Sequence, residues 1–153
     1  GLPSLLDLIH RSKLEGTAQQ TASIMRRARL EAIQRNLPAM VLVRPSENRV
    51  LAFLDDGSTG GAFDSDDTVL GEVPLPRGVE VRDEAGNVGS AADTFGDPDG
   101  PVFLGDGSAA ASGAVRLADV RNNVLQVEIA PAATGKPMVA DLARMPPQEV
   151  PVG

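Results

Sequence analysis

Residues 14–36, LEGTAQQTASIMRRARLEAIQRN, are followed by Leu37-Pro38 and then by an abrupt change to strand-like sequence. Mostly small residues recur in this stretch at steps of three and four, which places them along one face of a helix. They are Leu14, Ala18, Thr21, Met25, Ala28 and Ala32. This narrow apolar seam predicts a helix that lies close against another surface, with the rest of the protein built on it.

The helix is expected to cover residues 4–36. Gly16 weakens its middle by about 1 kcal/mol relative to alanine. Pro38 disfavours helical geometry at Leu37, so the helix should end at Asn36. At about 1.5 Å per residue it would be about 50 Å long. A single small domain covers less than this length, so part of the helix should project.

Short runs with alternating or β-branched residues follow Pro38 and predict strands. They lie at 39–43, 49–54, 68–73, 78–82, 101–104, 113–117 and 124–130, with a weaker run at 137–140. The turn-rich link between the first two predicts a hairpin. Together these features predict an α+β domain, in which a long N-terminal helix packs against antiparallel sheets.

The chain divides into three parts. We expect a helix over residues 1–37, a β-rich head over 38–144 and an extended or disordered tail over 145–153. Two stretches of the head, 55–67 and 83–100, are rich in Gly, Asp and Ser. They are predicted to be long surface loops.

Charge is divided unevenly along the chain of 153 residues, whose total charge is −7. Residues 1–37 carry six basic and three acidic side chains, a net +3, whereas the remaining 8 basic and 18 acidic side chains give −10. Such an acidic head repels phosphate backbones. With four Phe and no Trp or Tyr, few side chains can stack on a base. Both observations argue against a nucleic-acid partner.

The chain begins Gly1-Leu-Pro-Ser-Leu-Leu-Asp7, and this start has two interpretations. Ser4 and Asp7 fit a capping-box spacing after Pro3, as at a native helix start. The other interpretation, which we favour, is a chain cut partway along a longer helix, with Pro3 as a kink. No run reaches the roughly 18 apolar residues that a membrane-spanning helix needs.

The sequence contains few residues of the kinds that usually carry out catalysis. His10 is the only histidine, and the chain has no cysteine and no G-x-S-x-G motif, so Ser-His and Cys-His mechanisms and the usual zinc sites are not expected. Residues 105–110, GDGSAA, match G-x-G-x-x-A, but the sequence after them is too short for the helix that would hold a pyrophosphate. We predict a hairpin turn there, and neither an enzyme nor a cofactor.

Asp64, Asp66 and Asp67 place several oxygen ligands in one stretch and are a candidate Ca²⁺ site. An EF-hand would need Gly at its sixth position and Glu at its twelfth, where this chain has Val69 and Leu75. A solvated acidic loop is therefore favoured, and no other metal site is expected.

The basic cluster near the end of the helix comprises Arg26, Arg27, Arg29 and Arg35. Arg26 and Arg29 are three residues apart and share a face. Without interleaved aromatic residues, a solvated face or an ionic contact to a neighbouring subunit is favoured over a nucleic-acid site. The candidate nucleic-acid residues are Arg26, Arg29, Lys136 and Arg144.

Residues 23–38, SIMRRARLEAIQRNLP, followed by AMVLV, resemble the L-x-x-A-R-x-E-A-I-x-R-N-x-P-V signature of the GspH/FimT family of type IV pilin-like proteins. Weaker matches follow in family order. They are 69–70 with 75–79, 103–107 with 113–117, and 124–129 with 133–136. The resemblance extends over roughly residues 2–140.

The resemblance implies a pilin-like architecture. Family members have a signal cleaved by a prepilin peptidase and an apolar first half of the helix, which anchors the precursor in the bacterial inner membrane by a single pass. The second half packs on antiparallel sheets in a periplasmic head. This chain lacks the cleavage motif and the acidic residue near the mature N-terminus, so contact with the membrane is expected only through the missing N-terminal segment. The seam is expected to face either the head or a bundle of neighbouring helices.

The function that the resemblance implies is structural. We expect a minor pilin or minor pseudopilin that contributes to the initiation or tip complex of a type II secretion pseudopilus or a type IV pilus. Its partners would be other minor pilins or pseudopilins and the major subunit, with 55–67 and 83–100 as the loops that contact them.

The alternative is a DNA-binding minor pilin for DNA uptake, like FimT-like members, in which a basic G-R-x-R stretch touches DNA. At the matching place this chain has Gly135-Lys-Pro-Met138, which keeps one basic residue and replaces the second by methionine. This departure, together with the acidic head, argues against DNA binding.

Overall fold

The computed structural model describes residues 2–44, 47–54, 68–82 and 100–141. These residues form a helix, α1 (Leu2–Arg35), and eight strands. The strands are β1 (Ala39–Arg44), β2 (Arg49–Leu54), β3 (Thr68–Pro74), β4 (Glu80–Arg82), β5 (Val102–Phe103), β6 (Gly113–Ala118), β7 (Val124–Ile129) and β8 (Pro137–Asp141). The predicted α+β class and order of elements are confirmed.

Several predictions fall on other parts of the chain. The loop 55–67, the loop 83–100 except its last residue, and the tail 145–153 lie outside the described residues. So do the candidate calcium ligands Asp64, Asp66 and Asp67, and the candidate nucleic-acid residue Arg144.

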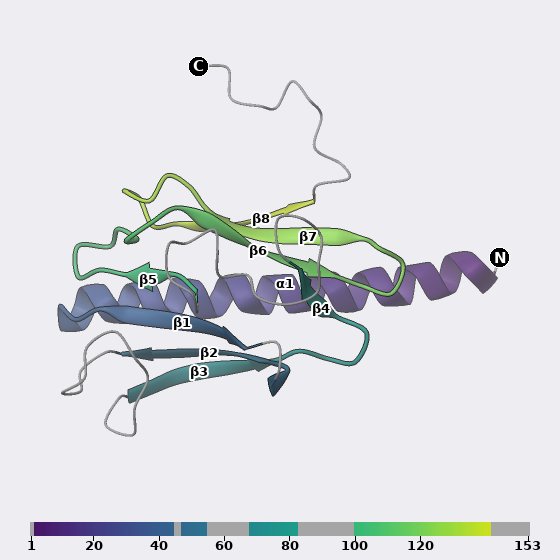
Figure 1. Cartoon of the computed structure of the whole chain (residues 1–153), viewed down its shortest axis with the longest axis horizontal. Coiled ribbons are helices and arrows are strands. Elements are labelled where there is room, and N and C mark those ends of the chain that lie inside the picture. Colours follow the sequence, from purple (N-terminus) through teal and green to yellow (C-terminus); the bar gives the residue numbers. More distant parts are fainter. Residues whose placement is uncertain (1, 45–46, 55–67, 83–99, 142–153) are drawn as a thin grey trace, which may run out of the picture.

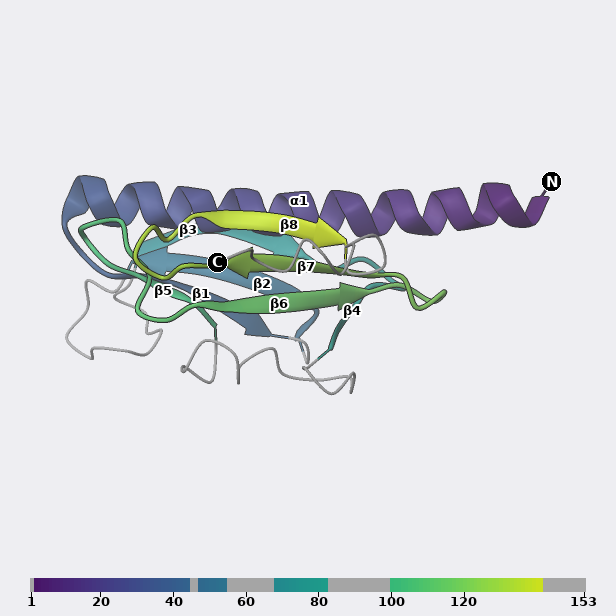
Figure 2. The same cartoon turned by 90° about the horizontal axis from the view of Figure 1, so that it is seen from above.

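The described strands form two antiparallel sheets of four strands each. The first has the order β3-β2-β1-β5 and the second β4-β6-β7-β8. β1 and β2 pair from Ala39 and Leu54 to Arg44 and Arg49, which confirms the predicted hairpin. The helix runs along both sheets and contacts their edge strands β3 and β8 (Figure 1 and Figure 2). It is therefore the element that joins the two sheets.

The helix ends in a left-handed cap at the predicted residue. Asn36 has a φ of 53°, a conformation that asparagine adopts more readily than most residues. The N–H of Leu37 donates to the carbonyl oxygen of Ala32 at 3.2 Å, which is the six-residue closure of a Schellman motif. Pro38 follows, and the chain enters β1 directly.

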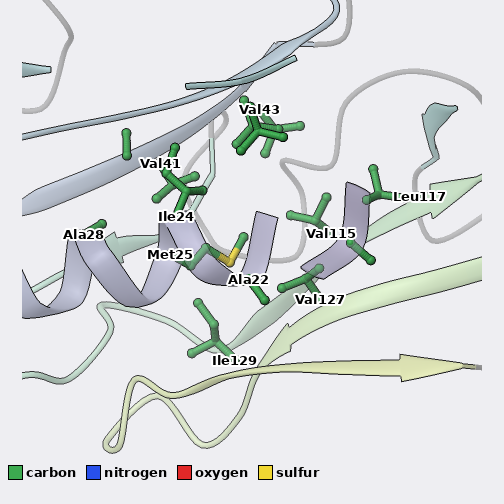
Figure 3. Packing of buried hydrophobic residues seen from close by; sticks show 14 of the residues in the cluster. Ala22, Ile24, Met25, Ala28, Val41, Val43, Val115, Leu117, Val127 and Ile129 are labelled. Carbon is green, nitrogen blue, oxygen red and sulfur yellow. The ribbon is translucent and has the colours of Figure 1, made fainter. Parts of the chain in front are cut away.

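The main core lies between α1 and the two sheets. Met25 is fully buried and lies between Val41 of β1 and Ile129 of β7 (Figure 3). Because the helix packs against two sheets rather than one, it buries a wider face than the seam alone, and Ala22 and Ile24 are buried as well.

Two threonines on the buried face of α1 keep their hydroxyl groups hydrogen-bonded within the helix. The Thr17 hydroxyl donates to the Lys13 carbonyl oxygen at 2.9 Å, and the Thr21 hydroxyl donates to the Thr17 carbonyl oxygen at 2.8 Å. Back-bonding of this kind satisfies a buried hydroxyl without a partner from the sheets. The helix can therefore bury polar side chains in its seam.

The first sheet has apolar side chains on both faces. Val41, Val43 and their neighbours belong to the main core. Met40, Leu42, Leu51 and Phe53 form a second buried cluster, against which Val102 packs. The near-continuous apolar run of β1 fits a strand buried on both sides rather than one with a solvent-facing side.

Candidate functional site

The seam of α1 faces the protein's own head. All six seam residues are 0% exposed; they are Leu14, Ala18, Thr21, Met25, Ala28 and Ala32. Four small side chains among the six allow the helix to approach the strands closely, as tight packing requires. Sequence left open whether this face meets the head or a bundle of neighbouring helices. Since the head already covers it, a neighbouring subunit would have to contact α1 on another face.

The N-terminal part of α1 extends past the ends of the strands (Figure 1 and Figure 2). Its apolar side chains are open to solvent, with Leu5, Leu6, Leu8 and Ile9 between 49% and 64% exposed. Leu14, by contrast, is fully buried. Exposed apolar segments of this kind are common at surfaces that take part in interactions.

The last turns of α1 carry a second exposed surface. Leu30 is 53% exposed and Ile33 is 40% exposed, and residues three apart lie on one side of a helix. Arg26 and Arg27 precede them by about one turn and are also exposed. We call these four residues the outer helix face. The sequence pattern indicated Arg26 and Arg27 but not the two apolar residues, although their spacing opposite the seam was a usable signal.

Arg29 has a structural role within the head. Its Nε donates to the carbonyl oxygen of Gly107 at 2.8 Å and to that of Thr134 at 3.1 Å. These carbonyls belong to the turns before β6 and before β8. Lys136, which follows Thr134 by two residues, is exposed. Three of the four candidate nucleic-acid residues thus lie near the same end of the helix, but the guanidinium of Arg29 is already engaged.

Residues 104–109 form a tight turn, as predicted. The N–H of Leu104 donates to the Ser108 carbonyl oxygen at 2.8 Å, and Phe103 and Ala109 form an antiparallel bridge. No helix follows in the described residues after the turn, where β6 begins at Gly113. A dinucleotide bound at this turn would therefore find no following helix whose N-terminus could hold its pyrophosphate.

The carboxylate of Asp106 is used inside this turn. Its Oδ1 accepts hydrogen bonds from the Ser108 hydroxyl at 2.6 Å and from the Ser108 N–H at 2.9 Å. These bonds, that from the hydroxyl first, lower the pKa of Asp106. The carboxylate therefore stabilises the turn.

Two shallow grooves follow α1, one beside each edge strand. The groove beside β8 has a volume of about 470 Å³, and Gly16, Leu125 and Val139 are among its lining residues. The groove beside β3 has a volume of about 430 Å³ and is lined in part by Arg27 and Gly71. Each groove is lined by residues of α1 and of the neighbouring sheet.

A larger groove of about 710 Å³ lies beside β4, at the end of the head where Lys13 of α1 meets Arg77. Its lining includes Arg77, Val81 and Asp119, and Lys13 donates from Nζ to the Arg77 carbonyl oxygen at 3.2 Å. Over the described ranges, no group of three or more His, Cys, Asp and Glu side chains is placed to hold a metal ion.

The helix does not have the composition of a membrane span. Among the residues that the structure describes, no helix is both long enough and apolar enough to cross a bilayer.

Comparisons with known proteins agree with this geometry. The family model described as "Type II transport protein GspH" matches residues 17–135 of the chain. No match was found among curated proteins.

Two solved structures are similar in fold. The minor pseudopilin EpsH from the type 2 secretion system of Vibrio cholerae aligns with a TM-score of 0.61 and 13% identity, over 84% of this chain and 97% of that chain. The type IV minor pilin FimU of Pseudomonas aeruginosa aligns with a TM-score of 0.61 and 11% identity, over 90% of this chain and 95% of that chain.

Proposed function

Because this chain belongs to the GspH family of type II transport proteins, we propose that it is a minor pilin-like subunit that helps to initiate a type II secretion pseudopilus or a type IV pilus, or stands at its tip. The role is structural and needs no catalytic group or cofactor. Its partners are other minor pilins or pseudopilins and the major subunit. The head lies in the periplasm, with the projecting end of the helix directed toward the inner membrane.

The observation that carries the proposal is the division of α1 into a covered part and a projecting part. The seam from Leu14 to Ala32 is buried against the protein's own sheets, whereas Leu5, Leu8 and Ile9 are at least half exposed. A helix that packs against its own head at one end, and is apolar and exposed at the other, is suited to insertion among the helices of neighbouring subunits. The exposed apolar surface is then buried on assembly, which is favourable by about 25 cal/mol per Å² before the entropy of association is subtracted.

The proposal includes both machines. One of the two similar structures is a pseudopilin and the other a pilin, and both align with a TM-score of 0.61. At 11–13% identity the likeness concerns the fold, so it does not favour one machine over the other.

The experiment combines binding and assembly. The purified chain is mixed with the purified heads of the other minor pilin-like subunits of the same organism, and co-purification is measured. In parallel, the gene is deleted, and secretion and surface piliation are measured with and without the restored gene. We expect stable binding to at least one head and loss of one of the two activities. Failure to bind any of the heads, with both activities intact, would refute the assembly role.

A further inference from the structure

The outer helix face, Arg26, Arg27, Leu30 and Ile33, lies at the end of α1 remote from the projecting leucines. Ala28 and Ala32, which point into the core from the same turns, are fully buried, whereas Leu30 is 53% and Ile33 40% exposed. Single exposed apolar residues are common on proteins. Leu30 and Ile33 lie three residues apart on one helix face and form a small apolar centre, which the turn at Gly107 borders beside Ile33.

Within the described part of the chain, the two arginines that border this centre have no acidic partner. Neither Arg26 nor Arg27 forms an ion pair with any residue that the structure describes, whereas Arg35 on the same helix pairs with Glu31 at 3.1 Å. Arg29 on the intervening position is held by two carbonyl oxygens. The outer helix face therefore presents two available guanidinium groups beside an apolar centre.

This combination has a definite chemistry. Guanidinium groups bind carboxylates in a bidentate manner and are more weakly hydrated than ammonium groups, so arginine is favoured at protein interfaces. Arginine and large apolar residues are enriched at the centre of interfaces. We propose that the outer helix face docks a neighbouring protein subunit, which presents aspartate or glutamate side chains around an apolar patch.

Charge complementarity favours a protein over a nucleic acid. The chain has a total charge of −7, and the part after residue 37 carries 18 acidic side chains against 8 basic ones. A duplex approaching two arginines would meet this repulsion over the rest of the head, and Leu30 and Ile33 would gain nothing from a phosphate backbone. A protein subunit can place a few carboxylates at the two arginines without a negative charge along its whole surface, and it can also cover the two apolar residues.

The inference rests on the proposed function, because it takes the occupant to be another pilin-like subunit. It adds where that subunit binds and which side chains it must present. The projecting helix end and the outer helix face then serve different contacts, one with neighbouring helices and one with a head that presents carboxylates around an apolar patch.

The test uses the soluble chain and, as probes, the purified heads of the other minor pilin-like subunits of its own machine, one at a time. Binding is titrated at low and at high salt. In the double variant Arg26→Glu/Arg27→Glu we expect the affinity for one head to fall by about tenfold or more. Leu30→Ser should weaken the same complex, and the affinity of the wild type should fall as salt is raised.

A matched control changes the charge equally elsewhere. Arg77 and Arg121 are exposed and lie toward the Lys13 end of the head, so Arg77→Glu/Arg121→Glu should bind nearly as the wild type does. Circular dichroism and the melting temperature confirm that each variant is folded. Since all four substituted arginine side chains are on the surface, both double variants should fold.

Three results overturn the inference, and they differ in meaning. If a head binds the wild type and the Arg26→Glu/Arg27→Glu variant equally, the docking surface is wrong while the proposed function stands. If no head binds the wild type, the proposed function fails and the docking surface with it. If duplex DNA binds the wild type and this binding is lost in the double variant, the outer helix face is a nucleic-acid surface.

Discussion

The Nε of Arg29, on α1, donates a hydrogen bond to the carbonyl oxygen of Gly107 at 2.8 Å. The same atom also lies 3.1 Å from the carbonyl oxygen of Thr134. One helical side chain thus connects the last third of α1 to the turn before β6 and to the turn before β8. The relative position of the helix and the second sheet depends on this contact as well as on the apolar core.

Replacing Arg29 by alanine should therefore destabilise the head. The carbonyl oxygen of Gly107 loses a charged donor in a partly buried place and that of Thr134 loses one at the surface, and we expect the free energy of unfolding to fall by about 1–3 kcal/mol. Urea denaturation measures this. Arg35→Ala removes an exposed pair with Glu31 and should lower the free energy of unfolding by about 0.5 kcal/mol or less. Equal losses of unfolding free energy in the two variants would show that the Arg29 contact stabilises the head no more than an exposed ion pair does.

Gly135 is the second position where this corner tolerates little change. Its φ is 63°, and a Cβ there would overlap the Gly107 carbonyl oxygen. We expect Gly135→Ala to lower the free energy of unfolding by about 1–3 kcal/mol, because an L-residue is strained in this conformation and the turns would have to separate. Thermal unfolding followed by circular dichroism is the measurement. A melting temperature unchanged from the wild type would mean that the two turns are not in contact in solution.

Replacing Gly16 by alanine should instead raise the free energy of unfolding. Gly16 lies within α1, and a Cβ added to it would meet no atom within 4 Å. Gly16→Ala should therefore stabilise the isolated protein by about 0.5–1 kcal/mol, since alanine has the higher helix propensity. The melting temperature should rise by a few degrees. A fall would show that the groove beside β8 is closed in solution.

Two alanine substitutions can distinguish the buried face of α1 from its exposed face. Met25 is 0% exposed in the core, whereas Leu30 is 53% exposed. Met25→Ala should cost about 2–5 kcal/mol of unfolding free energy through the cavity that it leaves. Leu30→Ala should change it by about 0.5 kcal/mol or less. If Leu30→Ala were the more damaging substitution, the assignment of the two faces would be reversed.

Much of the fold could be predicted from local sequence. The recurrence of small residues from Leu14 to Ala32 predicted the helix face, and Asn36 and Pro38 predicted its end. The strands were found within a few residues, and the differences have local causes. β4 begins at Glu80 rather than at Gly78. Gly78 has a φ of 91°, and the N–H of Val79 donates a hydrogen bond to the carbonyl oxygen of Pro76 within a turn.

The candidate site was less accessible to prediction. The contacts of Arg29 join residues that are 78 and 105 positions apart, and no local pattern encodes such a pairing. The orientation of the seam was undecided because a small-residue face suits a sheet and a helix bundle equally. Only the arrangement of two sheets around α1 determined it, and the same arrangement identified Leu30 and Ile33 as exposed.

The stability of the head should depend on pH through Asp119. This side chain is 1% exposed, and its carboxylate accepts hydrogen bonds from the N–H groups of Arg121 and Asn123 and from the Asn123 side chain at 2.8–3.0 Å. Burial by itself raises the pKa of Asp119, but these hydrogen bonds outweigh it, with a small contribution from His10, and the pKa lies below its ordinary value.

A lowered pKa in the folded state means that the unfolded chain binds this proton more readily than the folded one. The stabilisation from ionised Asp119 is therefore fully present above the ordinary aspartate pKa of about 4 and is lost as the pH falls through the lower folded value. Asp119→Asn removes the charge and keeps one acceptor oxygen. The wild type should be more stable than Asp119→Asn at neutral pH by about 1–2 kcal/mol, and urea denaturation should show this difference shrinking as the pH falls below about 4. Because all other carboxylates are common to both proteins, a difference that stays constant down to acid pH would contradict the role assigned to the Asp119 charge.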